Sequence, residues 1–135
     1  MRASVRCENC FRDRWRVAGL GEHLEELRSV EDLDRALKES NVRTVLLFKH
    51  SLTCPISARA FRELQSYLED ADSRISYKLI TVQTARDVSD EASSKLDVTH
   101  QSPQAILVRA GQPVWHASHS EITARALDSA IRNIA

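Results

Sequence analysis

The stretch KHSLTCPIS at residues 49–57 lies between an apolar run and an amphipathic pattern, and it decides how the chain folds. The residues before it, VLLF at 45–48, are typical of a short buried strand. The residues after it, 56–71, repeat apolar side chains at helical spacing. We therefore predict that Cys54 lies where a strand gives way to a helix. Pro55 then occupies the first helical position, where a missing N–H has little cost.

Cys54 is the candidate nucleophile. The free N–H groups and the macrodipole of a helix N-terminus favour a thiolate over a thiol. Ser57 stands where a Cys-x-x-Cys pair would have its second cysteine, so Cys54 cannot close a local disulfide after it attacks a substrate. We predict a mixed disulfide that an outside thiol resolves, with the Ser57 hydroxyl donating a hydrogen bond to the thiolate. The alternative is a buried structural cysteine.

The composition is that of a small globular domain. A chain of 135 residues can bury a hydrophobic core, and its 19 basic residues balance its 19 acidic ones. This balance gives no electrostatic reason to expect a nucleic acid or a membrane as partner. No apolar run approaches the roughly 20 residues that span a bilayer, and no secretory signal is evident. We therefore expect a cytoplasmic protein whose cysteines are reactive or bind metal, because structural disulfides are rare in reducing compartments.

Residues 1–22 form an arginine-rich segment with few apolar anchors, which we interpret as a partly ordered extension before a domain at 23–135. The segment contains Cys7 and Cys10, which would supply only half of a four-ligand zinc site. We interpret the two as exposed thiols outside the fold. The alternative is that one of them resolves the mixed disulfide on Cys54.

The rest of the chain alternates helical and strand patterns. Strands joined through a helix should run parallel, and the last two strands should pair as a hairpin. This order predicts an α/β fold with a central mixed sheet of four to five strands and helices on both faces. The predicted strands are 24–27, 45–48, 75–82, 105–108 and 113–117, and the predicted helices lie between Ser29 and Ser40, Pro55 and Asp70, Arg86 and Leu96, and Ser118 and Ile134.

The start of the last helix carries a specific signal. Ser118 and Glu121 match a capping box, so the helix is expected to begin at that point. The residues expected on its inner face are Ile122, Ala126, Ala130 and Ile134.

Four motifs, in order along the chain, resemble the monothiol bacilliredoxin family (YtxJ-like proteins of the bacillithiol system), which has a thioredoxin-like fold. They are FKHS at 48–51, TCPIS at 53–57, HQSPQ at 100–104 and WHASH at 115–119. The resemblance begins near residue 24 and leaves out the first segment. It implies a thiol–disulfide oxidoreductase that acts on proteins capped with bacillithiol, a cysteine linked to glucosamine and malate. In such a protein the reactive cysteine takes the cap onto itself, and a second thiol then frees it.

The resemblance and the neighbourhood of the cysteine together define the expected site. By fold analogy the Ser102–Pro103 bond is cis, which would turn the chain beside Cys54 and leave backbone groups free to pair with a substrate. From the residues alone, Pro103 is a proline at the start of a strand. Lys49 or a protonated His50 could further favour the thiolate. The expected catalytic residues are Cys54 and Ser57, and the expected substrate-binding residues are Lys49, His50, Thr53, Pro55, His100, Ser102 and Pro103.

We expect no cofactor apart from a low-molecular-weight thiol such as bacillithiol as co-substrate. The expected partners are S-thiolated client proteins. No metal site is expected, because His116 and His119 have no third ligand nearby. Two other functions remain open at this point. One is a non-catalytic sensor whose modified Cys54 is recognised by a partner, and the other is a dithiol oxidoreductase that uses Cys7 or Cys10 as resolving thiol.

Overall fold

The computed structural model describes residues 23–134, and the extension predicted at residues 1–22, with its two cysteines, lies outside them. Strands and helices alternate in the predicted order. None of the helices in the described part of the chain is both long and apolar enough to cross a membrane. The elements are β1 (Leu24–Glu26), α2 (Val30–Glu39), β2 (Val45–His50), α3 (Pro55–Leu68), β3 (Ser76–Thr81), α4 (Arg86–Leu96), β4 (Gln104–Arg109), β5 (Gln112–Ser118), the short 3-10 helix η1 (His119–Glu121) and α5 (Ala124–Ile134).

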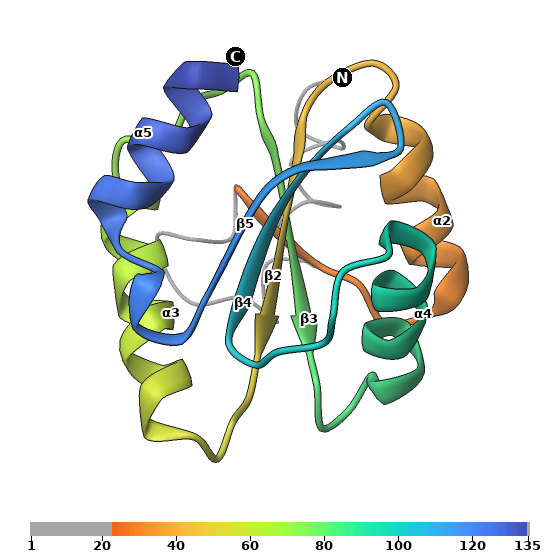
Figure 1. Cartoon of the computed structure of the whole chain (residues 1–135), viewed down its shortest axis with the longest axis horizontal. Coiled ribbons are helices and arrows are strands. Elements are labelled where there is room, and N and C mark those ends of the chain that lie inside the picture. The colour runs from red at the N-terminus through yellow and green to blue at the C-terminus, as the bar shows by residue number, and fades with distance from the viewer. Residues whose placement is uncertain (1–22, 135) are drawn as a thin grey trace, which may run out of the picture.

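The strands form one mixed sheet in the order β1-β3-β2-β4-β5. The strands β1 and β2 both run parallel to β3, whereas β4 is antiparallel to β2 and β5 is antiparallel to β4. Figure 1 shows α3 and α5 on one face of this sheet and α2 and α4 on the other. The mixed sheet covered on both faces agrees with the prediction, and the short strand β1 supplies its fifth strand at one edge.

The expectation that strands joined through a helix run parallel is wrong for β3 and β4. The helix α4 has 11 residues and therefore rises about 16 Å. The stretch 97–103 is long enough in extended form to return over that distance. In Figure 1 it carries the chain back along α4, so β4 starts at the end of the sheet where β3 finishes. The strand β4 then pairs with β2 in the antiparallel sense.

The strand β2 lies at the centre of the sheet and is buried on both sides. Val45 and Leu47 pack in the core beneath α2 and α4, whereas Leu46 and Phe48 pack in the core beneath α3 and α5. A strand covered on both faces needs apolar side chains in both directions, which explains the unbroken run VLLF. The strand ends at His50, and the loop that follows leads to Cys54.

The predicted start of the last helix is wrong. Ser118 and Glu121 do form a capping box, but the box caps η1 and not α5. His119 has a left-handed backbone with φ of 56°, and the chain is extended again at Ile122. Thr123 provides the cap of the real helix, because its Oγ1 accepts from the Ala126 backbone N–H at 3.0 Å. The buried residues of α5 are Leu127, Ala130 and Ile131.

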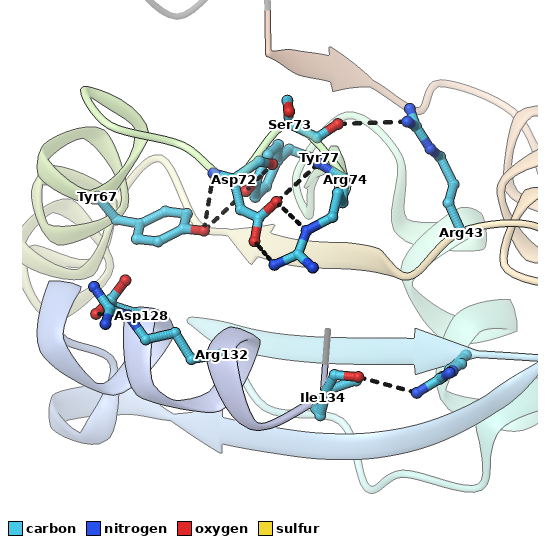
Figure 2. A network of polar contacts seen from close by, with 10 residues as sticks. Arg43, Tyr67, Asp72, Ser73, Arg74, Tyr77, Asp128, Arg132 and Ile134 are labelled. Carbon is cyan, nitrogen blue, oxygen red and sulfur yellow. Dashed lines mark hydrogen bonds and ion pairs between the residues drawn. The ribbon is translucent and has the colours of Figure 1, made fainter.

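Figure 2 shows a polar network that joins the end of α3 to β3. The buried hydroxyls of Tyr67 and Tyr77 lie 2.9 Å apart, and the Tyr77 hydroxyl donates to the Asp72 carbonyl at 2.9 Å. Arg74 donates to both carboxylate oxygens of Asp72, at 3.1 and 2.8 Å. Burial raises the pKa of Tyr77, so its hydroxyl stays protonated as a donor. The network satisfies the buried phenols at the end of the sheet opposite Cys54.

Candidate functional site

Cys54 is the N-cap of α3, with Pro55 at the first helical position, as the sequence predicts. Its backbone is extended, with φ of −101° and ψ of 121°, and its carbonyl accepts from the Ala58 N–H at 3.0 Å. The residue is partly exposed, and its thiol is free. The backbone N–H groups of the first helical turn have no partners within the helix, so this end of α3 favours negative charge at Cys54.

Gln83 holds the loop before Cys54, and sequence reasoning missed it. Its Oε1 accepts from the Leu52 backbone N–H at 3.0 Å, and its Nε2 donates to Ser51 Oγ at 2.8 Å and to Thr53 Oγ1 at 3.3 Å. Gln83 follows β3, which runs parallel to β2, and the ends of parallel strands meet at one edge of the sheet. A polar side chain just after the neighbouring parallel strand was the signal that could have pointed to it.

Ser57 does not form the expected hydrogen bond with Cys54. It is 0% exposed, and its Oγ accepts from the Ser51 backbone N–H at 2.8 Å. The same oxygen lies 2.9 Å from His50 Nδ1. Because the backbone N–H already occupies one lone pair, the hydroxyl is free to donate to the imidazole nitrogen. Ser57 therefore braces the loop and His50 instead of pointing at the thiol.

His50 lies on the α3 side of β2. Its ring stacks on Phe61 with centroids 4.6 Å apart and an interplanar angle of 21°. Burial lowers the pKa of His50 below its usual value, so the neutral imidazole dominates at neutral pH. The neutral form with the proton on Nε2 also fits the hydroxyl that Ser57 offers to Nδ1. A cationic His50 beside the thiol, which the sequence suggested, is therefore disfavoured.

Lys49 lies on the other face of β2, because neighbouring side chains of a strand point in opposite directions. It is 0% exposed, and its ammonium donates to Ser89 O at 3.0 Å and to Ser93 Oγ at 2.7 Å, both on α4. No carboxylate within residues 23–134 forms an ion pair with it. Burial lowers the pKa of Lys49 to about 8, although the Asp90 charge acts in the opposite direction. The ammonium is thus not on the surface that a client protein reaches.

The Ser102–Pro103 peptide bond is cis, in agreement with the prediction. Lys49 pairs with Gln104 in the register of β2 and β4, so Pro103 lies beside His50 at the end of the sheet where the chain turns toward Cys54. The Pro103 carbonyl accepts from the His119 N–H at 3.1 Å. Direct contact between the proline and the thiol stays a prediction.

Two buried polar atoms adjoin this proline, a hydroxyl and an amide oxygen. Ser102 Oγ and Gln104 Oε1 have no hydrogen-bond partner among the described residues.

His100, earlier in the same loop, is exposed as a whole, but its Nδ1 lies 3.3 Å from both Lys49 Nζ and Ser89 Oγ. Burial and the Lys49 charge lower the pKa of His100, so its ring is neutral at neutral pH. Through His100, the loop that leads to Pro103 is therefore attached to Lys49 of β2 and Ser89 of α4.

Apolar surface flanks Cys54. Leu52 is 62% exposed and Ile56 is 49% exposed, one before and one after the cysteine. Thr53 and Pro55 are exposed as well. A large aliphatic side chain at the surface gains by contact with a partner. We call Leu52 and Ile56, each two positions from Cys54 in the sequence, the apolar rim.

Within residues 23–134 no three histidines, cysteines or carboxylates are grouped to hold a metal ion, and His116 and His119 belong to no such group. A cavity of about 520 Å³ lies at the opposite end of the sheet. It is lined by Arg43, Arg74 and Arg109 with Ile134. Figure 2 labels Arg43, Arg74 and Ile134 at this end of the molecule.

Comparison with known proteins yields one family and one fold. Residues 25–127 match the family model described as monothiol bacilliredoxin BrxC. A solved structure described as a candidate oxidoreductase with a thioredoxin fold is 31% identical, with a TM-score of 0.74 over 86% of this chain and 99% of that one. Thioredoxin from Fasciola hepatica is 13% identical, with a TM-score of 0.66 over 81% of this chain and 97% of that one. Thioredoxin from Trypanosoma brucei brucei is 14% identical, with a TM-score of 0.67 over 82% and 89%. The matches confirm the predicted thioredoxin-like fold and support a thiol redox function.

Proposed function

Because the chain belongs to the monothiol bacilliredoxin family, we propose that it removes low-molecular-weight thiol caps, of the bacillithiol type, from oxidised proteins. Cys54 is the single attacking thiol. The observation that carries the proposal is the pairing of Cys54 at the N-cap of α3 with Ser57, and not a second cysteine, one turn further on. The same proposal includes S-thiolated client proteins as partners and the cytoplasm as the location, as expected from the sequence.

The proposed first step is one thiol–disulfide exchange. The Cys54 thiolate attacks the cap sulfur of the mixed disulfide, a new Cys54–cap disulfide forms, and the bond between the cap and the client breaks. The client cysteine leaves as a thiolate and takes a proton from solvent. The client is thereby reduced, while Cys54 now shares the disulfide with the cap.

In the proposed second step a free low-molecular-weight thiol attacks the cap sulfur on Cys54. Cys54 leaves as a thiolate, and the two small thiols depart as their disulfide. Within residues 23–134 there is no other cysteine that could resolve the intermediate, which favours an outside thiol. Cys7 and Cys10 are the remaining cysteines of the chain, and they lie outside the described residues.

The surroundings of Cys54 favour a protein as the capped substrate. The thiol is partly exposed, so a disulfide can reach it. The apolar rim of Leu52 and Ile56 offers contact area to a client, which a small polar disulfide would not use. Gln83 holds the loop between them in place, which lowers the entropy that is lost when the disulfide is aligned for attack.

The test uses a model protein that carries one bacillithiol cap, incubated with the wild-type chain and with Cys54→Ser. Intact-mass spectrometry should show the cap leaving the model protein and appearing on wild-type Cys54, and neither change with the variant. A Cys7→Ser/Cys10→Ser chain serves as the matched control and should behave as the wild type. If the cap leaves with Cys54→Ser present, or never reaches Cys54, the proposal fails.

The same experiment separates the other functions. A parallel substrate capped with glutathione shows which small thiol the site prefers. A sensor would accept the cap on Cys54 but would not release it when free thiol is added. A dithiol enzyme would release it without free thiol, and the Cys7→Ser/Cys10→Ser chain would then stall at the capped intermediate.

A further inference from the structure

Lys49 is a buried charge among neutral groups. Its three ammonium donors are directed at Ser89 O, Ser93 Oγ and His100 Nδ1, at 3.0, 2.7 and 3.3 Å. A buried ammonium has a desolvation cost that only well-placed acceptors offset. An apolar side chain of similar length would avoid this cost, so packing alone does not explain a lysine here.

The contacts join three parts of the molecule beneath the reactive end of the sheet. Lys49 belongs to β2, the strand whose end leads into the Cys54 loop. Ser89 and Ser93 belong to α4, and His100 belongs to the stretch 97–103 between α4 and β4. That stretch ends at Pro103, which the sheet register places beside the last residue of β2. Lys49 thus links the strand that carries the cysteine to the loop that carries the proline.

His100 is the part of that loop which Lys49 reaches. A protonated lysine has donors and no acceptor, so His100 Nδ1 must be the acceptor, and the ring proton lies on Nε2. The Ser89 hydroxyl, also 3.3 Å from Nδ1, shares the contact. The charged groups that act on the pair are Asp90 and Arg86, both from α4. Val98 anchors the start of the stretch, because it packs in the core beneath α2 and α4 and its N–H donates to Ser93 O at 3.1 Å. Among the described residues, His100 is the one member of 97–103 whose side chain forms hydrogen bonds to β2 and α4.

We propose that Lys49 is a positioning residue for the exchange reaction: through His100 it holds the loop 97–103, and with it Pro103, in place beside Cys54. The proposal rests on the proposed function for its catalytic consequence, but not for the anchoring itself. Lys49 is 0% exposed and touches neither client nor cap. It acts by keeping the part of the loop between the buried residues Val98 and Pro103 in one conformation.

The first test compares Lys49→Met with Lys95→Met by hydrogen exchange read by mass spectrometry. Methionine keeps the length and apolar character of the buried stem and removes the donors. Loss of a hydrogen bond from a charged donor should speed exchange of the amides at 98–105 about tenfold. Lys95 is the matched control, since it lies on α4 with 40% of its side chain exposed and, within residues 23–134, pairs only with Asp34 and Glu91. Unchanged exchange at 98–105 in Lys49→Met overturns the proposal, as does an equal increase over the whole chain.

The second test measures the reaction. Cap transfer to Cys54 should slow about tenfold in Lys49→Met, in proportion to the loosened loop, whereas alkylation of Cys54 by a small uncharged reagent should stay within about twofold of wild type. A loosened loop with unchanged cap transfer overturns the positioning role. If wild-type chain itself removes no cap, the proposed function fails, and the hydrogen-exchange result still decides whether Lys49 holds the loop.

A third test makes the inference independent of the folding of Lys49→Met. His100→Asn retains an acceptor near the position of Nδ1, whereas His100→Leu has none. Exchange at 98–105 should therefore rise in His100→Leu and less in His100→Asn, and adding Lys49→Met to His100→Leu should have little further effect. Equal behaviour of the two His100 variants, or full additivity of the double variant, overturns the link through His100. The pKa of His100 should also be higher in Lys49→Met than in the wild type, because the nearby charge is gone.

Discussion

At the scale of single residues, the most informative side chain is Ser57. It stands at the position where a dithiol enzyme would have its second cysteine, yet its hydroxyl serves the loop and His50. The residue is completely buried, so water cannot reach its hydroxyl and the protein itself must provide the hydrogen-bond partners. Ser57 therefore contributes first to the shape of the site, and its effect on the thiol is indirect.

Ser57→Ala should destabilise the fold. The change leaves the Ser51 N–H and His50 Nδ1 without their partner, and a buried unsatisfied group costs about 1–3 kcal/mol. The free energy of unfolding, from urea titration at pH 7.5, is the measurement. Ser66→Ala, at an exposed position of the same helix, is the control and should stay close to wild type. Equal stability of the two variants would contradict the bracing role of Ser57.

The lowered pKa of His50 gives a prediction about acid. Because burial lowers the folded-state pKa, the unfolded chain binds the proton more readily than the folded one. The contribution of the neutral imidazole is therefore complete above the unfolded value of about 6.5 and is lost as the pH falls below it. His100 acts in the same direction, since its pKa is also lowered.

The expected result is that wild-type chain loses more stability between pH 7.5 and pH 5.5 than His50→Gln does. Urea midpoints at the two pH values measure this directly. The glutamine variant retains a polar side chain but cannot titrate, so it removes only the pH-dependent contribution of His50 to the free energy of unfolding. Parallel losses in both chains would show that His50 titrates normally in the folded state.

At the scale of elements, the end of β3 controls the approach to α3. Gln83 makes its three side-chain hydrogen bonds to the loop that connects β2 with α3, and the Val82 N–H donates to the His50 carbonyl at 2.9 Å. A parallel neighbour thus holds the loop from one side, while the helix N-terminus holds it from the other. The position of Cys54 depends on both.

Gln83→Ala should slow cap transfer to Cys54 about fivefold, because the loss of roughly 1 kcal/mol of loop order lowers the fraction of aligned thiol. The melting temperature should change little, since Gln83 is exposed and contributes no core contact. Thr84→Ala, at the next exposed position, is the matched control. The role of Gln83 is refuted if both variants react at the wild-type rate.

At the scale of the whole molecule, the reactive end and the opposite end of the sheet are built differently. The Cys54 end combines exposed loops, an apolar rim and a buried lysine. The opposite end contains the tyrosine network (Figure 2) and the arginine-lined cavity. Both rest on the same two-sided core around β2, so the loops at the reactive end can vary without loss of the fold.

A chain that begins at Glu22 should fold and remove caps at the wild-type rate. The family match lies within residues 25–127, and the described core clusters are built from residues that this shorter chain retains. Circular dichroism and the cap-transfer assay are the measurements. A folded but inactive truncated chain would instead favour Cys7 or Cys10 as the resolving thiol.

Local sequence patterns were enough to predict most elements and the place of Cys54. The run VLLF, the Pro55 position and the Ser29 cap each act within one strand or one helical turn, where the backbone responds mainly to its own side chains. The order of elements then restricts the topology to a mixed sheet. Fold analogy, and not the residues alone, pointed to the cis bond at Pro103.

Only the tertiary structure decided which groups meet at the site. Gln83 reaches Leu52 across 31 positions of sequence, and Lys49 reaches Ser93 across 44. Such pairs depend on which strand lies beside which and on which helix covers each face, and no periodicity encodes that. The same holds for the direction of β4, which follows from the return of the chain along α4. A strand pattern shows that Lys49 and His50 point to opposite faces, but the packed helices determine that one is buried against α4 and the other stacks on α3.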